Sequence, residues 1–416
     1  MTEHPVPVNV APVTAAKELR GRRVLVTGGG FIGGRLIEVL VDGCGADVVV
    51  LVRRPESAAR YVGSRCEVKV GDVTDRVRVA EALVGCDTVF HCAYGTSGSR
   101  RHRAFVNREG TRRVLQAAAQ AGVRRVVCLS TVMVYGRTGS GDLTEDAPRR
   151  RFGTHYADSK LLGEKIALDL AAGGRAPAVV LQPTNVYGPN GDVWARDVVT
   201  RLRSGLVPLL DGGKGLCNHV YVDDVVRAML LASVAEGVVG EAFLISSTEP
   251  VTWQEFYGRF ECLLGAERTV EMSGAEAAER WRESLAAVPR LHRELAAAAR
   301  SRRLDLRKLF GTREGRAVRK GVVALLPESW QERIRRRLPE RPAAAAPLSP
   351  TGELPVHLLA PAEIAYFTAQ TRVRIDKARR LLGYDPMVDL DQGMQLTAAW
   401  LAEVGLLDPE RPADEG

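Results

Sequence analysis

A turn of three glycines, placed between an apolar strand and a helix, constrains the fold of this chain more than any other feature. The apolar stretch 23–27 predicts a buried strand, and the stretch 35–41 predicts a helix. The turn between them follows the pattern G-x-G-x-x-G, which lets the backbone approach a pyrophosphate at the N-terminus of the helix. The residues that we expect to contact such a dinucleotide are Gly28, Gly30, Phe31, Ile32 and Gly33.

Further strands alternate with helices along the first half of the chain. We expect these strands over residues 47–52, 68–70, 88–91 and 125–129, with an amphipathic helix over 107–121. Such alternation is typical of parallel strands with helices on both faces of the sheet. The sequence therefore predicts an α/β protein with a Rossmann-type, doubly wound parallel sheet. Ligands of such sheets bind at the carboxyl ends of the strands.

Tyr156 and Lys160 are four residues apart, so on a helix they lie on one face. A nearby ammonium favours the phenolate, and we expect Lys160 to lower the pKa of Tyr156 from its usual value of about 10. A tyrosine tuned in this way can take a proton from a hydroxyl or give one to a carbonyl. Thr131, which follows the expected strand 125–129, would hold the substrate oxygen. These three residues predict hydride transfer at a carbinol or ketone carbon, with a nicotinamide as the other party.

Two arginines indicate which nicotinamide cofactor is used. A carboxylate about twenty residues after the last glycine usually binds the ribose 2′-hydroxyl of NAD. Here Arg53 stands in that place, with Arg54 beside it. Guanidinium groups suit a 2′-phosphate, so we favour NADP over NAD. The alternative is that both arginines are merely solvated at a strand end and that the cofactor is NAD.

Many further motifs occur in an order that resembles one family. Segments within 23–262 and 370–402 are similar to the extended short-chain dehydrogenase/reductases of the NAD-dependent epimerase/dehydratase family. The resemblance is carried by residues 24–33, 71–73, 91–93, 107–111, 130–136, the Tyr156/Lys160 pair, 182–189, 221–224 and 377–386. It implies a Rossmann domain followed by a smaller C-terminal substrate domain, and a homodimer formed through the helices that contain Asn107 and Tyr156.

The resemblance also implies roles for single residues. Tyr156 would be the acid/base, Thr131 would bond the substrate oxygen, and Lys160 would lower the pKa of the tyrosine and hold the nicotinamide ribose. Asp72 and Val73 would contact the adenine.

The remaining implied roles concern the cofactor ribose, the support of the site and the substrate. Ala93 would contact the cofactor ribose. Asn107 would either support the site or cap the helix that follows it. Asn185 would either touch the substrate or organise its own turn. His91 is expected to be a packed residue at a strand end.

Departures from the family pattern narrow the chemistry. The family's 4,6-dehydratases have an Asp-Glu pair after the catalytic Thr, and its UDP-glucuronate decarboxylases carry a Glu there. Here Val132 and Met133 follow Thr131, and neither can exchange a proton. Dehydration and decarboxylation of those kinds are therefore disfavoured. Epimerisation through a transient ketone, or reduction of a ketone and its reverse, remains.

The substrate is less constrained, because two arginines that often clamp a diphosphate are replaced. Gln182 stands at one of these places and residues 217–219, Cys-Asn-His, at the other. Our leading hypothesis is a 4-epimerase or 4-ketoreductase of a sugar nucleotide. The alternative is an NADPH-dependent ketoreductase of a non-nucleotide natural-product intermediate. A third hypothesis is a non-catalytic dinucleotide-binding scaffold, against which the intact Thr131, Tyr156 and Lys160 count.

Composition and charge bound the rest of the chain. The 416 residues include no apolar run long enough for a membrane span, and the seven scattered cysteines form no CxxC pair. Residues 1–20 lack the apolar region of a signal peptide and are expected to be a flexible extension. We therefore expect a cytoplasmic enzyme with no metal site and no nucleic-acid partner. Residues 21–185, completed by parts of 215–250, would form the NAD(P)-binding domain, and 186–416 the substrate-binding domain.

A basic insertion interrupts the expected substrate domain at about 265–360. The net charge of the whole chain is +8, and residues 271–341 alone contain 18 Arg and Lys against 10 Asp and Glu. We expect helices over 275–300 and around Trp330, Ile334 and Leu338, the second of them basic and amphipathic, and a Pro/Ala linker over 341–355. Residues 300–341 would contact a membrane surface or an acidic partner, or simply form a solvated face.

Overall fold

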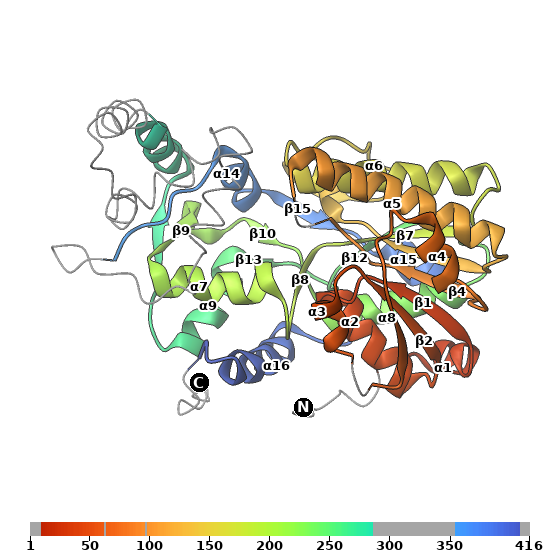
Figure 1. Ribbon diagram of the computed structural model, residues 1–416. Coiled ribbons are helices and arrows are strands. Elements are labelled where there is room, and N and C mark those ends of the chain that lie inside the picture. The colour runs from red at the N-terminus through yellow and green to blue at the C-terminus, as the bar shows by residue number, and fades with distance from the viewer. Residues whose placement is uncertain (1–9, 62–63, 96–97, 286–353, 408–416) are drawn as a thin grey trace, which may run out of the picture. The chain divides into compact units, whose positions relative to one another are not determined.

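The computed structural model describes residues 10–61, 64–95, 98–285 and 354–407, which fall into two compact units (Figure 1). The first unit takes in the described residues of Met1–Val198, Leu216–Leu264 and Ala369–Gly416. The second takes in those of Val199–Gly215 and Gly265–Thr368. The described part of Ala369–Gly416, which the sequence assigned to the substrate domain, is grouped with the unit that contains the sheet.

A seven-stranded parallel sheet forms the centre of the first unit, in the order β12-β7-β5-β4-β1-β2-β3. Its strands are β1 (Arg23–Thr27), β2 (Asp47–Val52), β3 (Cys66–Val70), β4 (Thr88–His91), β5 (Arg125–Leu129), β7 (Ala178–Pro183) and β12 (Ala242–Ile245). The order reverses between β1 and β4, which is the switch point where such sheets bind ligands. The predicted Rossmann-type sheet is confirmed, and β1, β2, β4 and β5 have the predicted bounds.

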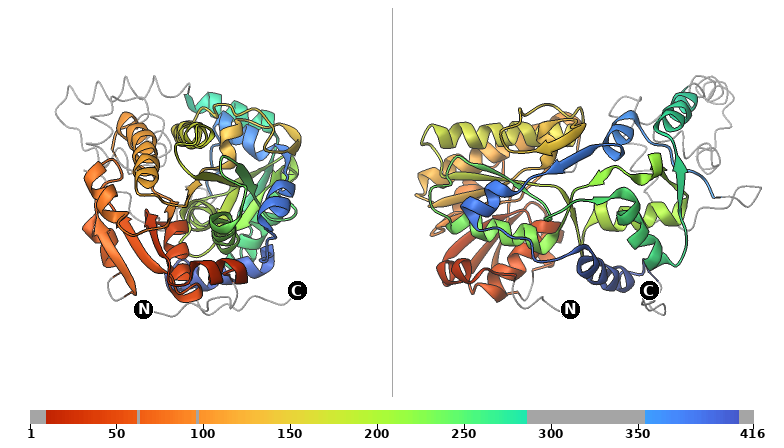
Figure 2. Two further views of the ribbon diagram at one scale, coloured as in Figure 1. Left: turned by 90° about the vertical axis from the view of Figure 1, so that its right-hand side faces the viewer. Right: turned by 180° about the vertical axis from the view of Figure 1, so that it is seen from behind.

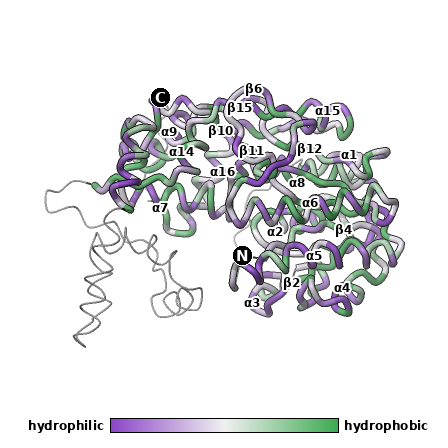
Figure 3. The backbone as a smooth tube through the Cα atoms, turned by 90° about the horizontal axis from the view of Figure 1, so that it is seen from above, coloured by the Kyte–Doolittle hydropathy of each residue, from purple (hydrophilic) through white to green (hydrophobic). Residues whose placement is uncertain are grey.

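Helices cover both faces of this sheet (Figures 1 and 2). One face packs against α4 (Arg76–Ala82), α5 (Arg100–Gln120) and α6 (His155–Ala172). The other packs against α1 (Val13–Leu19), α2 (Phe31–Glu38), α8 (Val222–Val234) and α15 (Asp376–Leu382). Strand β2 is buried on both faces from Val48 to Val52, as expected for its continuous run of branched residues. Figure 3 shows hydrophobic and hydrophilic residues alternating along the covering helices.

The N-terminal segment differs from the flexible extension that the sequence predicted. Residues 1–9 lie outside the described residues, but residues 13–19 form α1. Ala15 and Leu19, one helical turn apart, are fully buried in the core cluster that contains α2 and α8. The spacing of these two apolar residues lets even a short helix bury one face, and packing of that face holds the segment in place.

Smaller elements complete the first unit. Three short pairings are β6 (Ser140–Leu143) with β15 (Gln370–Val373), β8 (Asn185–Tyr187) with β11 (His219–Tyr221), and β10 (Leu216–Cys217) with β13 (Val251–Thr252). The remaining helices are α3 (Pro55–Ala59), α9 (Trp253–Leu264) and α16 (Leu390–Glu403), with short turns η1 (Val39–Gly43), η2 (Val132–Tyr135) and η3 (Asp192–Arg196). No helix among the described residues is long and apolar enough to cross a bilayer.

The second unit is smaller and has its own two-stranded parallel sheet. Its elements are β9 (Val207–Leu210), η4 (Asp211–Gly213), β14 (Thr269–Met272) and α14 (Pro361–Phe367), and α7 (Asp197–Ser204) leads into it. Residues 274–285 are helical, which confirms the first part of the helix expected over 275–300. The rest of that helix, the basic helix around Trp330 and the linker over 341–353 lie outside the described residues.

Candidate active site

The glycine turn adopts a conformation that requires glycine at two of its positions. Gly28 has a φ of +82°, and a Cβ there would lie 2.7 Å from the Cα of Ala93. A Cβ at Gly33 would collide with the carbonyl oxygen of Gly28. A Cβ at Gly30, by contrast, would meet no atom within 4 Å. The turn is therefore packed against β4 at Gly28 and open at Gly30, which fits the approach of a dinucleotide pyrophosphate.

Helix α2 begins directly at the turn, with Gly30 as its N-cap. No side chain caps its first backbone N–H groups, so they can serve an anion. The helix starts four residues before the predicted stretch 35–41 and continues into η1, so that Phe31 and Ile32 form its first turn. The hydroxyl of Tyr61 donates a 2.8 Å hydrogen bond to the carbonyl of Gly29 and fixes the turn from the side.

The residues expected at the adenosine end lie at the ends of β2 and β3. Arg53 follows β2 directly and is partly exposed. Asp72 follows β3, and its Oδ1 accepts hydrogen bonds from the backbone N–H and the hydroxyl of Thr74. Val73 is buried against Gly110 of α5. Their contacts with adenine and with a 2′-phosphate stay predictions.

Thr131 and Tyr156 meet at the carboxyl end of β5. Thr131 is buried, and its hydroxyl caps η2 by accepting from the N–H of Met133. Tyr156 lies in the first turn of α6, which Thr154 caps by accepting from the N–H of Ala157 at 3.3 Å. The hydroxyl of Thr131 lies close enough to the phenol of Tyr156 to lower its pKa by hydrogen bonding. The structure thus brings together the two groups that the sequence assigned to one substrate oxygen.

Lys160 lies one helical turn after Tyr156, as predicted. Its Nζ donates to the carbonyl oxygen of Leu129 at 2.8 Å and lies 5.3 Å from the ring centroid of Tyr94. Burial lowers the pKa of Lys160 to about 8.

The expected effect of Lys160 on Tyr156 is not found. Burial raises the pKa of Tyr156 to about 12, although the hydrogen bond with Thr131 acts in the opposite direction. This rise occurs although 39% of the surface of Tyr156 is exposed, and Lys160 does not offset it, because its ammonium is directed at a backbone carbonyl and an aromatic ring. The prediction of a lowered tyrosine pKa was therefore wrong for the protein as this structure describes it.

A buried polar network that the sequence analysis missed lies behind Thr131. Glu164 is fully buried on α6, one turn after Lys160, and its Oε2 accepts from the hydroxyl of Ser130 at 2.6 Å. Its Oε1 accepts from Arg149 and, at 2.8 Å, from the amide of Gln182. A buried carboxylate needs such partners, and here they tie the end of β5 to α6. The four-residue spacing of Tyr156, Lys160 and Glu164 is the sequence feature from which Glu164 could have been predicted to lie on the same helix face.

Asn107 supports the site and does not cap a helix. Helix α5 begins at Arg100 and is capped by Ser99, so Asn107 lies inside it. Its Oδ1 accepts from the N–H of Gly95 at 2.6 Å, and its Nδ2 donates to the hydroxyl of Ser159 at 3.0 Å. The side chain therefore joins α5, the segment after β4 and the first turns of α6.

His91 is a packed residue at the end of β4, as expected. Its Nδ1 lies 2.7 Å from the hydroxyl of Thr27 and its Nε2 lies 3.1 Å from that of Thr111. Burial lowers the pKa of His91 to about 3, so the ring is neutral at working pH.

The positions where the family often has diphosphate-binding arginines make internal contacts here. Gln182 is fully buried between Tyr135 and Glu164. Asn218 donates to the carbonyl of Thr371 and accepts from the N–H of Val373, which joins it to β15. Asn185, at the start of β8, is buried and donates to the sulfur of Cys217 at 3.6 Å. Its contact with a substrate stays a prediction.

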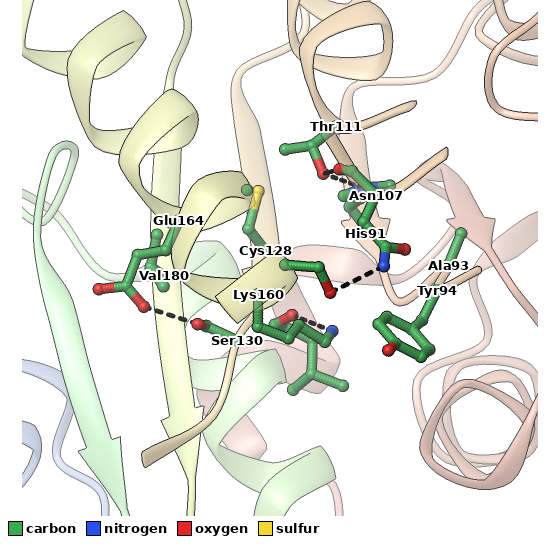
Figure 4. Close-up of a pocket in the computed structure, with 13 residues that line it drawn as sticks. His91, Ala93, Tyr94, Asn107, Thr111, Cys128, Ser130, Lys160, Glu164 and Val180 are labelled. Carbon is green, nitrogen blue, oxygen red and sulfur yellow. Dashed lines mark hydrogen bonds between the residues drawn. The ribbon is translucent and has the colours of Figure 1, made fainter. Parts of the chain in front are cut away.

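Tyr94 is a second residue that the sequence analysis missed. It follows Ala93, and its ring packs edge-on against that of Tyr156 with centroids 5.1 Å apart. Figure 4 shows this ring beside Lys160 in a pocket that is also lined by Asn107, Cys128 and Ser130. Its position directly after the strand-end residues 91–93 is the sequence feature from which Tyr94 could have been predicted as a site residue.

Comparison with known proteins identifies the family of this chain. Residues 24–246 match the model of the NAD dependent epimerase/dehydratase family. One relative, a 4-hydroxy-2-methyl-3-oxo-4-farnesyl-3,4-dihydroquinoline-1-oxide ketoreductase of Stigmatella aurantiaca, is 32% identical over 240 residues, which cover 56% of this chain and 71% of the relative. A 3-beta-hydroxysteroid dehydrogenase of Mycolicibacterium neoaurum is 31% identical over 251 residues, covering 56% and 68%.

Solved structures show the same fold over nearly the whole chain. An epimerase of Methanothermobacter thermautotrophicus superposes with a TM-score of 0.64 at 21% identity, covering 96% of this chain and 97% of its own. A UDP-glucose 4-epimerase of Thermotoga maritima superposes with a TM-score of 0.61 at 20% identity, covering 92% and 99%. By its motifs, its sheet and its matching sequence model, this chain belongs to the NAD-dependent epimerase/dehydratase family and is an NAD(P)-dependent enzyme of the extended short-chain dehydrogenase/reductase type.

Proposed function

We propose that the protein is an NADPH-dependent ketoreductase, or the reverse dehydrogenase, that acts on a carbonyl or carbinol carbon of a non-nucleotide substrate. The observation that carries this proposal is that the side chains of Thr131 and Tyr156 lie close enough to affect each other, with Lys160 one turn along α6. A bound nicotinamide would supply or accept the hydride. The chain itself has to hold the substrate oxygen and move one proton.

Thr131 and Tyr156 divide that task. The Thr131 hydroxyl would hold the substrate oxygen at the point where the Tyr156 phenol can reach it. A pKa of about 12 keeps the phenol protonated, so this site is prepared to donate a proton to a developing alkoxide. Donation to the oxygen is the step that ketone reduction requires. Lys160 would bind the cofactor ribose and stabilise the phenolate that remains.

The residues after Thr131 support reduction over elimination. Val132 and Met133 in η2 carry no group that exchanges a proton. Loss of water or of carbon dioxide by the routes of the related dehydratases and decarboxylases would need such a group near the substrate. Hydride and proton transfer at one carbon needs only the three residues already described.

The choice of a non-nucleotide substrate rests on two observations. Gln182 and Asn218 have their polar atoms bound to other parts of the chain, so neither is available to clamp a diphosphate. Three relatives are matched over two thirds or more of their own length, and they are named as a ketoreductase and as hydroxysteroid dehydrogenases. The first observation counts against a diphosphate and the second favours a cyclic ketone or alcohol, whereas sugar nucleotides were our leading expectation from the sequence.

A single substitution tests the assignment of Tyr156. Tyr156→Phe removes the proton donor and keeps the ring that packs on Tyr94, so turnover should fall by at least about 10²-fold. Dinucleotide affinity, measured by fluorescence titration, should stay within about threefold, because the phenol is not needed to bind the cofactor. Activity that survives this change refutes the assignment of Tyr156.

A substrate panel distinguishes the alternatives. Purified protein would be tested with cyclic ketones, hydroxysteroids and UDP- and dTDP-sugars while the absorbance of NADPH is followed at about 340 nm. A ketoreductase consumes NADPH stoichiometrically with the ketones. A sugar-nucleotide 4-epimerase would interconvert the sugars without added cofactor and would keep its dinucleotide through purification, and that result would replace the present proposal.

A further inference from the structure

Tyr94 occupies a central place in the site without an assigned role. Its ring lies 5.1 Å from the ring of Tyr156, at an interplanar angle of 72°, and 5.3 Å from Nζ of Lys160 (Figure 4). It is therefore in contact with both ionisable residues of the predicted catalytic set. The ammonium lies within the range of about 6 Å at which a cation is attracted to the face of an aromatic ring.

The Tyr94 ring is held in this place at its far end. Its hydroxyl lies close enough to the side chains of Asn107 and Ser159 for them to lower the pKa of Tyr94 by hydrogen bonding, against the larger effect of burial. Asn107 also accepts from the N–H of Gly95, the residue after Tyr94, and Ser159 donates to the carbonyl oxygen of Tyr156. The hydroxyl thus orients the ring, and the face of the ring is left to serve Lys160.

Lys160 needs such a neighbour because it is half-buried and no carboxylate among the described residues forms an ion pair with it. Glu164, the carboxylate on the next turn of α6, is bound to Ser130, Arg149 and Gln182. The backbone carbonyl of Leu129 accepts one hydrogen bond from the ammonium. Burial lowers the pKa of Lys160 to about 8, so small changes in its surroundings change its charge at working pH.

The other titratable groups around Lys160 do not change charge near pH 8. Burial lowers the pKa of His91 to about 3. Burial raises the pKa of the remaining neighbours, to about 12 for three of them and above the usual tyrosine value for the fourth; they are Cys92, Cys128, Tyr156 and Tyr94. A transition near pH 8 in this site therefore reports on Lys160.

We propose that Tyr94 is a positioning residue, which keeps the Lys160 ammonium charged and in place through the face of its aromatic ring. The role of Lys160 in turnover rests on the proposed function. The role of Lys160 in binding the dinucleotide does not depend on which substrate is used. The test therefore measures dinucleotide binding.

The test compares two variants that separate the ring from the hydroxyl. Tyr94→Phe keeps the aromatic face and loses the hydroxyl that lies beside Asn107 and Ser159. Tyr94→Leu keeps an apolar side chain and loses the face. Dinucleotide affinity is measured by fluorescence titration from pH 6 to pH 10 for the full chain, with Lys160→Met as the reference without an ammonium.

In the wild type, affinity should fall with a midpoint near pH 8 as Lys160 loses its proton. Tyr94→Leu should move the midpoint about one pH unit toward acid, because the charged form loses its partner. Tyr94→Phe should keep the wild-type midpoint. Lys160→Met should bind weakly and show no transition near pH 8. If Tyr94→Leu does not fold, as judged by circular dichroism, Tyr94→Met replaces it with the same expectation.

Three results would overturn the proposal: a Tyr94→Leu midpoint equal to that of the wild type, an equal shift in Tyr94→Phe, or no transition near pH 8 in the wild type. A merely structural role of Tyr94 would lower stability without moving the midpoint. If no ketone is turned over, the proposed function fails while the binding profiles still decide the role of Tyr94.

Discussion

Tyr156 and Lys160 show how burial acts on single residues of this site. Both pKa values move against the charged form, to about 12 for the tyrosine and to about 8 for the lysine. The spacing of the two residues predicts that they share a helix face, but spacing contains no information about solvent. The protonated phenol and the easily titrated ammonium follow from the surroundings that the fold gives these two side chains of α6.

Arg53 carries the prediction of cofactor preference. NADPH should bind more tightly than NADH to the wild type, because a guanidinium at the end of β2 can pair with the 2′-phosphate. Arg53→Ala should reduce NADPH affinity about tenfold or more and leave NADH affinity nearly unchanged. The control is Arg65→Ala, which makes the same change in net charge by removing an exposed arginine that is paired with Asp42. Equal affinities for the two cofactors in the wild type would end the argument from the 2′-phosphate.

At the scale of elements, the site is made where strand ends and helix starts meet. The glycine turn joins β1 to α2, Ala93 follows β4, and Thr131 follows β5. Helix α6 then supplies Tyr156, Lys160 and Glu164 from one face. Because a parallel sheet aligns the carboxyl ends of its strands, these segments meet although they are distant in sequence.

The glycine turn allows a prediction with a matched control. Gly28→Ala should lower the free energy of unfolding by about 1–3 kcal/mol, since its φ of +82° and the closeness of Ala93 both disfavour a Cβ. Gly30→Ala should leave stability nearly unchanged, because a Cβ there meets no atom, yet should weaken dinucleotide binding at least about tenfold. Urea denaturation and fluorescence titration measure the two effects. Wild-type cofactor affinity in Gly30→Ala would show that the open side of the turn does not receive the cofactor.

At the scale of the whole chain, the first unit is closed by contacts between segments far apart in sequence. Asp224 of α8 accepts hydrogen bonds from the backbone N–H groups of Met387 and Val388, which follow α15. Asp223 beside it pairs with Arg35 of α2 at 2.6 Å. These two carboxylates hold the N-terminal turn region and the C-terminal segment on the same helix.

Asp224 predicts a pH dependence of stability. Burial raises its pKa to about 6, above its ordinary value of 3.8, so the fold favours the protonated carboxyl. The resulting contribution to stability is complete below pH 3.8 and is lost as pH rises to about 6, by at most about 3 kcal/mol. Asp224→Asn, which stays neutral and keeps an acceptor for Met387, should gain stability relative to the wild type over this interval. Denaturation curves at pH 4 and pH 7 measure the difference, and a constant difference would contradict the assigned pKa.

The sequence alone determined the alternation of strands and helices in the first half of the chain and the strand ends at which the candidate site residues lie. The continuous run of branched residues in β2 is stable in a sheet that is covered on both faces, and the glycine turn can adopt few conformations. The local sequence pattern was therefore sufficient to predict both elements. The helix containing Asn107 was found, but its start was placed seven residues late, because Ser99 and the residues after it show no apolar periodicity.

Only the tertiary structure decided the contacts and charges that depend on packing. The burial of α1, the ring of Tyr94 on Lys160 and the network around Glu164 join segments that are remote in sequence. The raised pKa of Tyr156 likewise reflects desolvation by several elements at once. Motifs along the chain record which residues are present, whereas the free energy of an ionisable or aromatic group depends on what surrounds it in three dimensions.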